Sequence, residues 1–186
     1  ITLFQNSIKV LDELEKNNKD YVLLTNAPRP NETVKKFLTS MGLEEKKAKQ
    51  VYTSGQAALD QLKVTEFSNF FHIGPPRDFD LFKRFQNQKS EKIDSSDLLL
   101  CTGLFDNHEK DLQFYEKLFF THVKKKMICT NPDLIVDRGE VREFCAGTIA
   151  KIFENMGGEV KYFGKPYPEI YEKAFNNLKN KKVICI

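Results

Sequence analysis

The sequence predicts an α/β fold with helices on both faces of a parallel sheet. Two short apolar runs, residues 21–24 and 98–101, show no alternation of polar and apolar side chains, which is typical of strands buried on both faces. Segments whose apolar residues recur at helical spacing alternate with such runs along the chain. A length of 186 residues is sufficient for a sizeable hydrophobic core.

The first 50 residues contain a helix, a strand and a second helix. Ser7 is a good N-cap for a helix with apolar residues at 8, 11 and 14, and Asn31 for one with apolar residues at 34, 37, 38 and 41. Gly42 provides a common end for the second helix. We expect the strand at 21–24 to lie between these two helices.

A second set of strands and helices begins at residue 51. Apolar runs at 70–73, 98–101 and 127–130 alternate with helical segments, and Asp-Arg-Gly at 137–139 indicates a hairpin turn. The run at 160–163 indicates a return to the first sheet, and residues 183–186 have the composition of a central strand. We therefore expect a core formed by residues 1–50 and 160–186, interrupted by an α/β insert at 51–159.

Composition and charge restrict the class of function. A net charge of +3, with Lys and Glu interspersed, does not indicate nucleic-acid binding. No apolar run approaches the roughly 20 residues that span a bilayer, and the start has no signal-peptide pattern. We expect a cytoplasmic protein without a nucleic-acid or membrane partner. Four cysteines without a C-x-x-C pair indicate reduced thiols rather than metal ligands: Cys101, Cys129, Cys145 and Cys185.

Polar residues follow two of the predicted strands of the core. Thr25 and Asn26 end the first, and Lys165 follows the run at 160–163 on a loop bracketed by Gly164 and Pro166. In open α/β sheets ligands bind outside the carboxyl ends of the strands. A hydroxyl, an amide and an ammonium placed there can bind an anion such as phosphate. Each stretch by itself is also compatible with a strand that ends in a polar turn.

Leu-Thr-Asn at 24–26 and Gly-Lys-Pro-x-Pro at 164–168 place Thr25 and Lys165 140 positions apart and resemble motifs of the haloacid dehalogenase-like phosphatases. The large insert between them resembles that of class IIA, the NagD and 4-nitrophenyl phosphatases. This resemblance implies a Rossmann-like core with an inserted α/β cap. It also implies that Thr25 donates its hydroxyl to a phosphoryl oxygen, that the Asn26 backbone amide assists, and that Lys165 neutralises charge on the nucleophile and the transferred group.

The resemblance further implies an Mg²⁺-dependent hydrolysis of a small phosphorylated metabolite through an aspartyl-phosphate, and it is compatible with a homodimer. The family's Asp-x-Asp nucleophile motif would precede this sequence, and its Gly-Asp metal motif would follow Ile186, so we expect segments to be missing at both ends. No metal ligand is assigned within the sequence. The alternative hypothesis is a binding or scaffold protein that keeps the fold without these acids.

The insert carries candidate specificity residues. By the resemblance, Asn131 and Asp133 of an Asn-Pro-Asp segment contact the substrate, together with Pro166 of the core, although Asn-Pro-Asp is also a common turn. An Asp-x-Asp pair exists at Asp78 and Asp80. We reject it as the nucleophile, because Gly and Pro rather than an apolar strand precede it. We expect this pair to cap a helix over 81–85.

Overall fold

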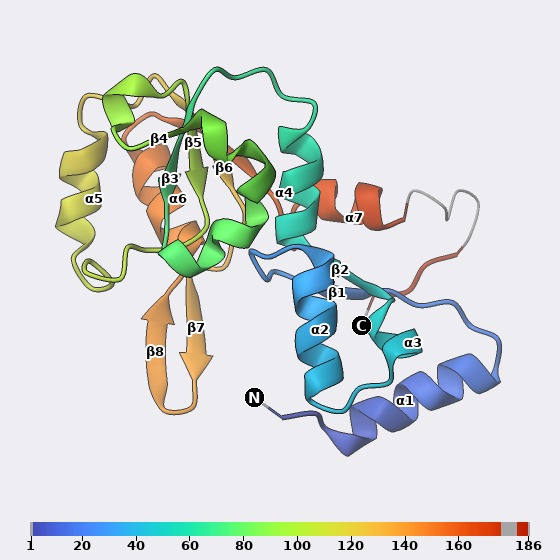
Figure 1. Cartoon of the computed structure of the whole chain (residues 1–186). Helices are drawn as coiled ribbons and strands as arrows, with labels where there is room; N and C mark the ends of the chain where they lie inside the picture. The colour runs from blue at the N-terminus through green and yellow to red at the C-terminus, as the bar shows by residue number, and fades with distance from the viewer. Residues whose placement is uncertain (1, 176–181, 186) are drawn as a thin grey trace.

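The computed structural model describes residues 2–175 and 182–185, and it confirms the α/β class (Figure 1). The elements follow one another in this order: α1 (Gln5–Lys16), β1 (Leu23–Thr25), α2 (Asn31–Ser40), α3 (Glu45–Ala48), β2 (Val51–Thr53), α4 (Ser54–Leu62), β3 (Phe70–Ile73), the 3₁₀ helices η1 (Pro76–Leu81) and η2 (Lys83–Gln88), β4 (Lys89–Ser90), η3 (Ile93–Ser95), β5 (Leu98–Cys101), α5 (Leu112–Phe119), β6 (Lys126–Cys129), β7 (Ile135–Arg138), β8 (Val141–Phe144), α6 (Ala146–Asn155), β9 (Glu159–Tyr162) and α7 (Pro168–Ala174).

A five-stranded parallel sheet, in the order β4-β3-β5-β6-β9, forms the larger part of the structure. Successive residues of β5 alternate between its faces: Leu99 belongs to the cluster that includes side chains of α5 and α6, whereas Leu100 belongs to the cluster that includes α4 and η1. All four residues of β5 are buried. The uninterrupted apolar run at 98–101 is thus explained by a strand that is covered on both faces.

The first part of the chain forms a smaller unit. Strands β1 and β2 pair in parallel, with Leu23 opposite Val51, and α1, α2 and α3 lie around them (Figure 1). The two predicted N-caps are wrong. Helix α1 begins at Gln5, two residues before Ser7, and Asn31 Oδ1 accepts a hydrogen bond from the Thr53 N–H at 2.9 Å. Asn31 therefore holds β2 in place instead of capping its own helix.

Two strands lie in a different sheet from the one that the sequence indicated. We expected residues 51–53 to be in the insert, but β2 pairs with β1; we expected the run at 160–163 to join the first sheet, but β9 pairs with β6. The reason is that a buried parallel strand has the same apolar composition whichever neighbour it has. The division of the chain into domains at 50 and 160 stays a proposal. It has to be reconciled with the pairing of β2 with β1 and of β9 with β6.

The predicted central strand at 183–186 is not present in its described part. Residues 183–185 have no regular secondary structure, and Ile184 is 86% exposed; Ile186 lies outside the described residues. A strand requires a neighbour with which to form hydrogen bonds, and in the described residues β1 pairs with β2 alone.

The predicted hairpin turn at 137–139 is confirmed. Strands β7 and β8 pair antiparallel, and Gly139 lies between them with φ of +62°. This hairpin projects from the rest of the chain (Figure 1). In the part of the chain that the structure describes, no helix is long and apolar enough to cross a membrane.

The start of α4 packs closely against the loop that follows β1. Gly55 donates its N–H to the Ala27 carbonyl at 3.1 Å, and the Thr53 hydroxyl donates to the Arg29 carbonyl at 2.5 Å. A Cβ added at Gly55 would lie 2.3 Å from the Arg29 nitrogen. Because α4 connects β2 to the five-stranded sheet, this contact fixes the loop at 26–30 at the junction between the two sheets.

We predict that Gly55→Ala destabilises the fold by about 3 kcal/mol, since the added methyl group meets backbone atoms that cannot rotate away. The free energy of unfolding in urea measures the effect. Gly139→Ala is the matched control, because its positive φ costs about 1 kcal/mol but no atom lies within 4 Å of the added Cβ. Equal losses in the two variants would contradict the close contact.

Candidate functional site

The side chain of Asn26 brings three of the predicted site residues together at the end of β1. Asn26 Oδ1 accepts a hydrogen bond from the Lys165 N–H at 2.7 Å, and Asn26 Nδ2 donates to the Lys165 carbonyl at 3.0 Å. The same Nδ2 donates to Asp133 Oδ1 at 2.8 Å. Thr25, the last residue of β1, is half-buried, and its Oγ1 accepts the Ala27 N–H at 3.3 Å.

Asp133 lies in a turn after β6 that is held by its neighbours. The Asp133 N–H donates to Asn131 Oδ1 at 2.9 Å, and the Asp133 carbonyl accepts the Gly147 N–H at 3.1 Å. A Cβ added at Gly147, in the first turn of α6, would lie 2.2 Å from the Pro132 carbonyl oxygen. The side chain of Asn131 therefore closes the turn, and that of Asp133 is directed to Asn26.

Lys165 follows β9 on a loop whose conformation depends on Gly164. Gly164 has φ of +129°, and a Cβ there would lie 2.5 Å from Pro132 Cδ and 2.8 Å from Asn26 Oδ1. The side chains of Lys165 and Pro166 are exposed. Among the side chains that the structure describes, no carboxylate lies within ion-pair distance of the Lys165 ammonium. This cation is thus available to an anionic ligand.

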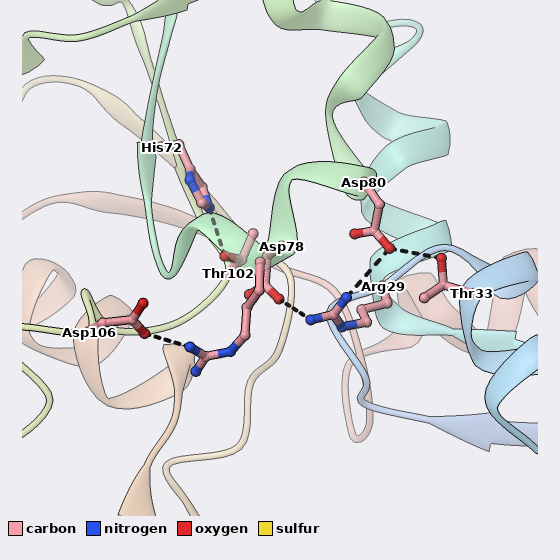
Figure 2. A network of polar contacts seen from close by, with 8 residues as sticks. Arg29, Thr33, His72, Asp78, Asp80, Thr102 and Asp106 are labelled. Carbon is pink, nitrogen blue, oxygen red and sulfur yellow. Dashed lines mark hydrogen bonds and ion pairs between the residues drawn. The ribbon is translucent and has the colours of Figure 1, made fainter. Parts of the chain in front are cut away.

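A second contact joins the loop at 26–30, which follows β1, to η1 (Figure 2). The Arg29 guanidinium forms ion pairs with Asp78 at 3.0 Å and with Asp80 at 3.5 Å, and the Thr33 hydroxyl donates to Asp80 at 2.8 Å. The predicted capping role of Asp78 and Asp80 is therefore wrong: both lie within η1 and pair with Arg29. Sequence reasoning missed Arg29, although an arginine between two prolines in the loop after a strand was a usable signal.

Burial shifts the pKa of two groups in this network. The Asp78 side chain is 6% exposed, and burial raises the pKa of its carboxyl, while the Thr102 hydroxyl and Arg29 act in the opposite direction. His72 Nε2 lies 2.8 Å from Thr102 Oγ1, and burial, with a smaller effect of Lys89, lowers the pKa of His72 to about 3 (Figure 2). The imidazole is therefore neutral at physiological pH.

Metal ligands and disulfides are not found in the described part of the chain. No group of three or more His, Cys, Asp or Glu residues there is arranged to hold a metal ion. The cysteines are free thiols. Asp78 and Asp80 both form ion pairs with Arg29.

We predict that Asp78→Asn gains stability relative to wild type as the pH rises from about 4 to 7. The folded pKa of Asp78 lies above its ordinary value of 3.8, so the native state binds this proton more tightly than the unfolded chain. Raising the pH through this window therefore lowers the wild-type free energy of unfolding, and the asparagine variant lacks this loss. Urea unfolding at several pH values measures the difference. A difference that does not change with pH would contradict the burial of a charged Asp78.

Part of the chain matches a known protein family. Residues 1–86 match the family model described as haloacid dehalogenase-like hydrolase. A search of curated proteins finds no match to the chain.

Solved structures match almost the whole chain. A haloacid dehalogenase-like hydrolase from Brucella suis 1330 is 28% identical with a TM-score of 0.84, over 96% of this chain and 66% of the other. A 4-nitrophenylphosphatase from Thermotoga maritima is 22% identical with a TM-score of 0.70, over 96% and 68%. A p-nitrophenyl phosphatase from Archaeoglobus fulgidus is 17% identical with a TM-score of 0.68, over 95% and 67%.

The chain thus spans about two thirds of the length of the structures that it matches. The family match covers β1, the loop after it and η1, and the structural match to the Brucella suis protein covers 96% of the chain. Residues 1–86 thus match the haloacid dehalogenase-like hydrolase family, and the solved structures share the fold of the chain, in agreement with the resemblance of the Thr-Asn and Gly-Lys-Pro motifs.

Proposed function

We propose that the protein containing this chain is a phosphatase that hydrolyses the phosphate ester of a small metabolite through an aspartyl-phosphate intermediate. The observation that supports this proposal best is the pair of hydrogen bonds between the Asn26 side chain and the Lys165 backbone. It joins the loop of the Thr-Asn motif to the loop of the lysine motif. Two of the matched structures are named as nitrophenyl phosphatases, which favours the same reaction.

The proposed roles follow from the contacts of each group. Phosphoryl transfer requires positioning and charge neutralisation more than covalent chemistry by side chains. Thr25 Oγ1 accepts the Ala27 N–H, which leaves the hydroxyl hydrogen to be donated to a phosphoryl oxygen. Lys165 is exposed, and its ammonium would stabilise negative charge on the transferred group. The Asn26 side chain is engaged by protein atoms, so its contribution to phosphate binding would come from the backbone N–H.

Magnesium is proposed as the cofactor on the resemblance alone. When bound, it would neutralise charge on the phosphate and orient it. The described residues do not form a fitting site, because they contain no cluster of acidic ligands, and the acidic pair in η1 is held by Arg29. We therefore assign no ligand and no step to the metal within this chain.

Asp133 and Asn131 are proposed to select the substrate, with Pro166 at the edge of the same site. The side chain of Asp133 is directed to Asn26, and both belong to loops at the carboxyl ends of strands, where ligands bind in α/β proteins. Asn131 acts by closing the turn that presents Asp133.

We predict that Asp133→Ala changes the relative kcat/KM of different phosphate esters, while the melting temperature remains close to that of wild type. The lost group is an exposed carboxylate, whose removal usually changes stability by no more than about 0.5 kcal/mol. A panel of sugar, aryl and alkyl phosphates measures the effect. The same proportional loss on every ester would argue against a selective role.

The test of the proposed function is Lys165→Ala in the complete protein, assayed with Mg²⁺ and an aryl phosphate. Loss of one preorganised charge donor lowers turnover by about 10²- to 10³-fold, and the variant should melt close to wild type because the side chain is exposed. Lys165→Arg should not restore full activity, since a planar guanidinium does not replace a compact ammonium.

Lys161→Ala is the matched control. Lys161 is an exposed lysine of β9, four residues before Lys165, and its ammonium lies over the Phe163 ring at 5.7 Å. This variant should keep the wild-type turnover. Near-normal turnover of Lys165→Ala would refute the proposed role, and a wild-type protein that hydrolyses no phosphate ester would favour the non-catalytic alternative.

A further inference from the structure

We infer that Asn26 is a positioning residue, whose side-chain amide sets the places of both Lys165 and Asp133 relative to the end of β1. The geometric part of this inference stands on the hydrogen bonds of the described residues. Its kinetic part rests on the proposed phosphatase function. Asn26 thereby acts on the reaction through two other residues, in addition to any contact of its own backbone with phosphate.

The bonding capacity of the amide matches this place. A primary amide offers two N–H donors and one carbonyl acceptor. Nδ2 uses its donors on the Lys165 carbonyl and on Asp133 Oδ1, and Oδ1 accepts the Lys165 N–H. Aspartate has no donor when ionised, leucine has neither donor nor acceptor, and glutamine is one methylene longer. Asparagine is the side chain that supplies this set at this distance from the backbone.

The two loops that meet at Asn26 also pack against each other. The site of a Cβ on Gly164 is filled by Pro132 Cδ at 2.5 Å and by Asn26 Oδ1 at 2.8 Å. On the other side, the Asp133 carbonyl is held by the Gly147 N–H at 3.1 Å. A displacement of the Asn26 amide would therefore be transmitted to the turn at 131–133 and to the loop at 164–165, because Asn26 and Pro132 both lie against Gly164.

The charges around the amide make one substitution diagnostic. Asp133 Oδ1 lies 2.8 Å from Asn26 Nδ2. Asn26→Asp would place two carboxylates at that distance and would leave the Lys165 carbonyl without its donor, so like charges would separate the loops. Asp133→Asn in the same chain would remove the repulsion and would supply a new donor.

The first experiment measures amide hydrogen exchange at Lys165 and Gly147 and needs no enzymatic activity. Asn26→Leu keeps the branched shape of the side chain but removes its three hydrogen bonds. We expect exchange of the Lys165 N–H to become at least about tenfold faster, the equivalent of one lost hydrogen bond, with a smaller increase at Gly147. Asn107→Leu, at an exposed asparagine outside the site, is the matched control and should leave both rates unchanged. Unchanged exchange at Lys165 in Asn26→Leu would overturn the inference.

The second experiment compares kinetics of the complete protein with Mg²⁺ and an aryl phosphate. Asn26→Asp should lower kcat by about 10²-fold with a much smaller change in KM, because misplacing a catalytic group by about 1 Å can cost that much. Adding Asp133→Asn should recover about tenfold of that loss, whereas Asp133→Asn alone should not exceed wild type. A double variant no better than Asn26→Asp would overturn the coupling through Asp133.

The two experiments separate this inference from the proposed function. If the wild-type protein hydrolyses no phosphate ester but Asn26→Leu accelerates exchange at Lys165, the coupling stands and the phosphatase proposal fails. If Asn26→Leu does not fold, the exchange comparison is made between Asn26→Asp and its Asp133→Asn double variant. Restored protection at Gly147 in the double variant would then support the inference, and equal exchange would overturn it.

Discussion

The hydrogen bonds of the Asn26 amide are the interaction on which the arrangement of this site depends. They connect a two-stranded sheet, which ends in Thr25, to two loops of the five-stranded sheet. Three residues further along the same loop, Arg29 makes the second connection, to η1 after β3. One short loop therefore contacts the segments that follow β3, β6 and β9 in the larger sheet. This is possible because the carboxyl ends of parallel strands lie at one edge of their sheet.

The pairing of the charges distinguishes Arg29 from Lys165. Arg29 forms ion pairs with two carboxylates of η1, one of them buried, and these ion pairs hold η1 against the loop. Lys165 is exposed and has no carboxylate partner among the described side chains. Its backbone, by contrast, is bonded on both sides of the residue by Asn26. A fixed backbone with an unpaired ammonium is the arrangement that electrostatic stabilisation requires.

The sequence predicted most strands of the larger sheet and placed Asn26 and Lys165 at strand ends, but it did not predict the partners of every element. The uninterrupted apolar side chains of residues 98–101 predicted a buried strand, and all four residues of β5 are buried. Nothing in the run at 160–163 distinguished β6 from β1 as its neighbour, since pairing depends on which strand edge is open. The pair of Arg29 with Asp78 spans 49 residues and has no local pattern at all. Periodicity reports burial, whereas long-range pairing is decided by the packing of the whole chain.

Asn26 contacts Lys165 although β9 joins a different sheet from β1, and the reason is physical. Ligand sites of α/β proteins are built from loops at the carboxyl ends of strands, so it is the meeting of these loops that matters. Thr25 belongs to the smaller sheet and Lys165 follows a strand of the larger one. The distance between hydroxyl and ammonium is therefore set by how the two sheets are joined. Asn26 and Arg29 make that junction within four residues of the chain, so the loop that carries the Thr-Asn motif also fixes how the two sheets are joined.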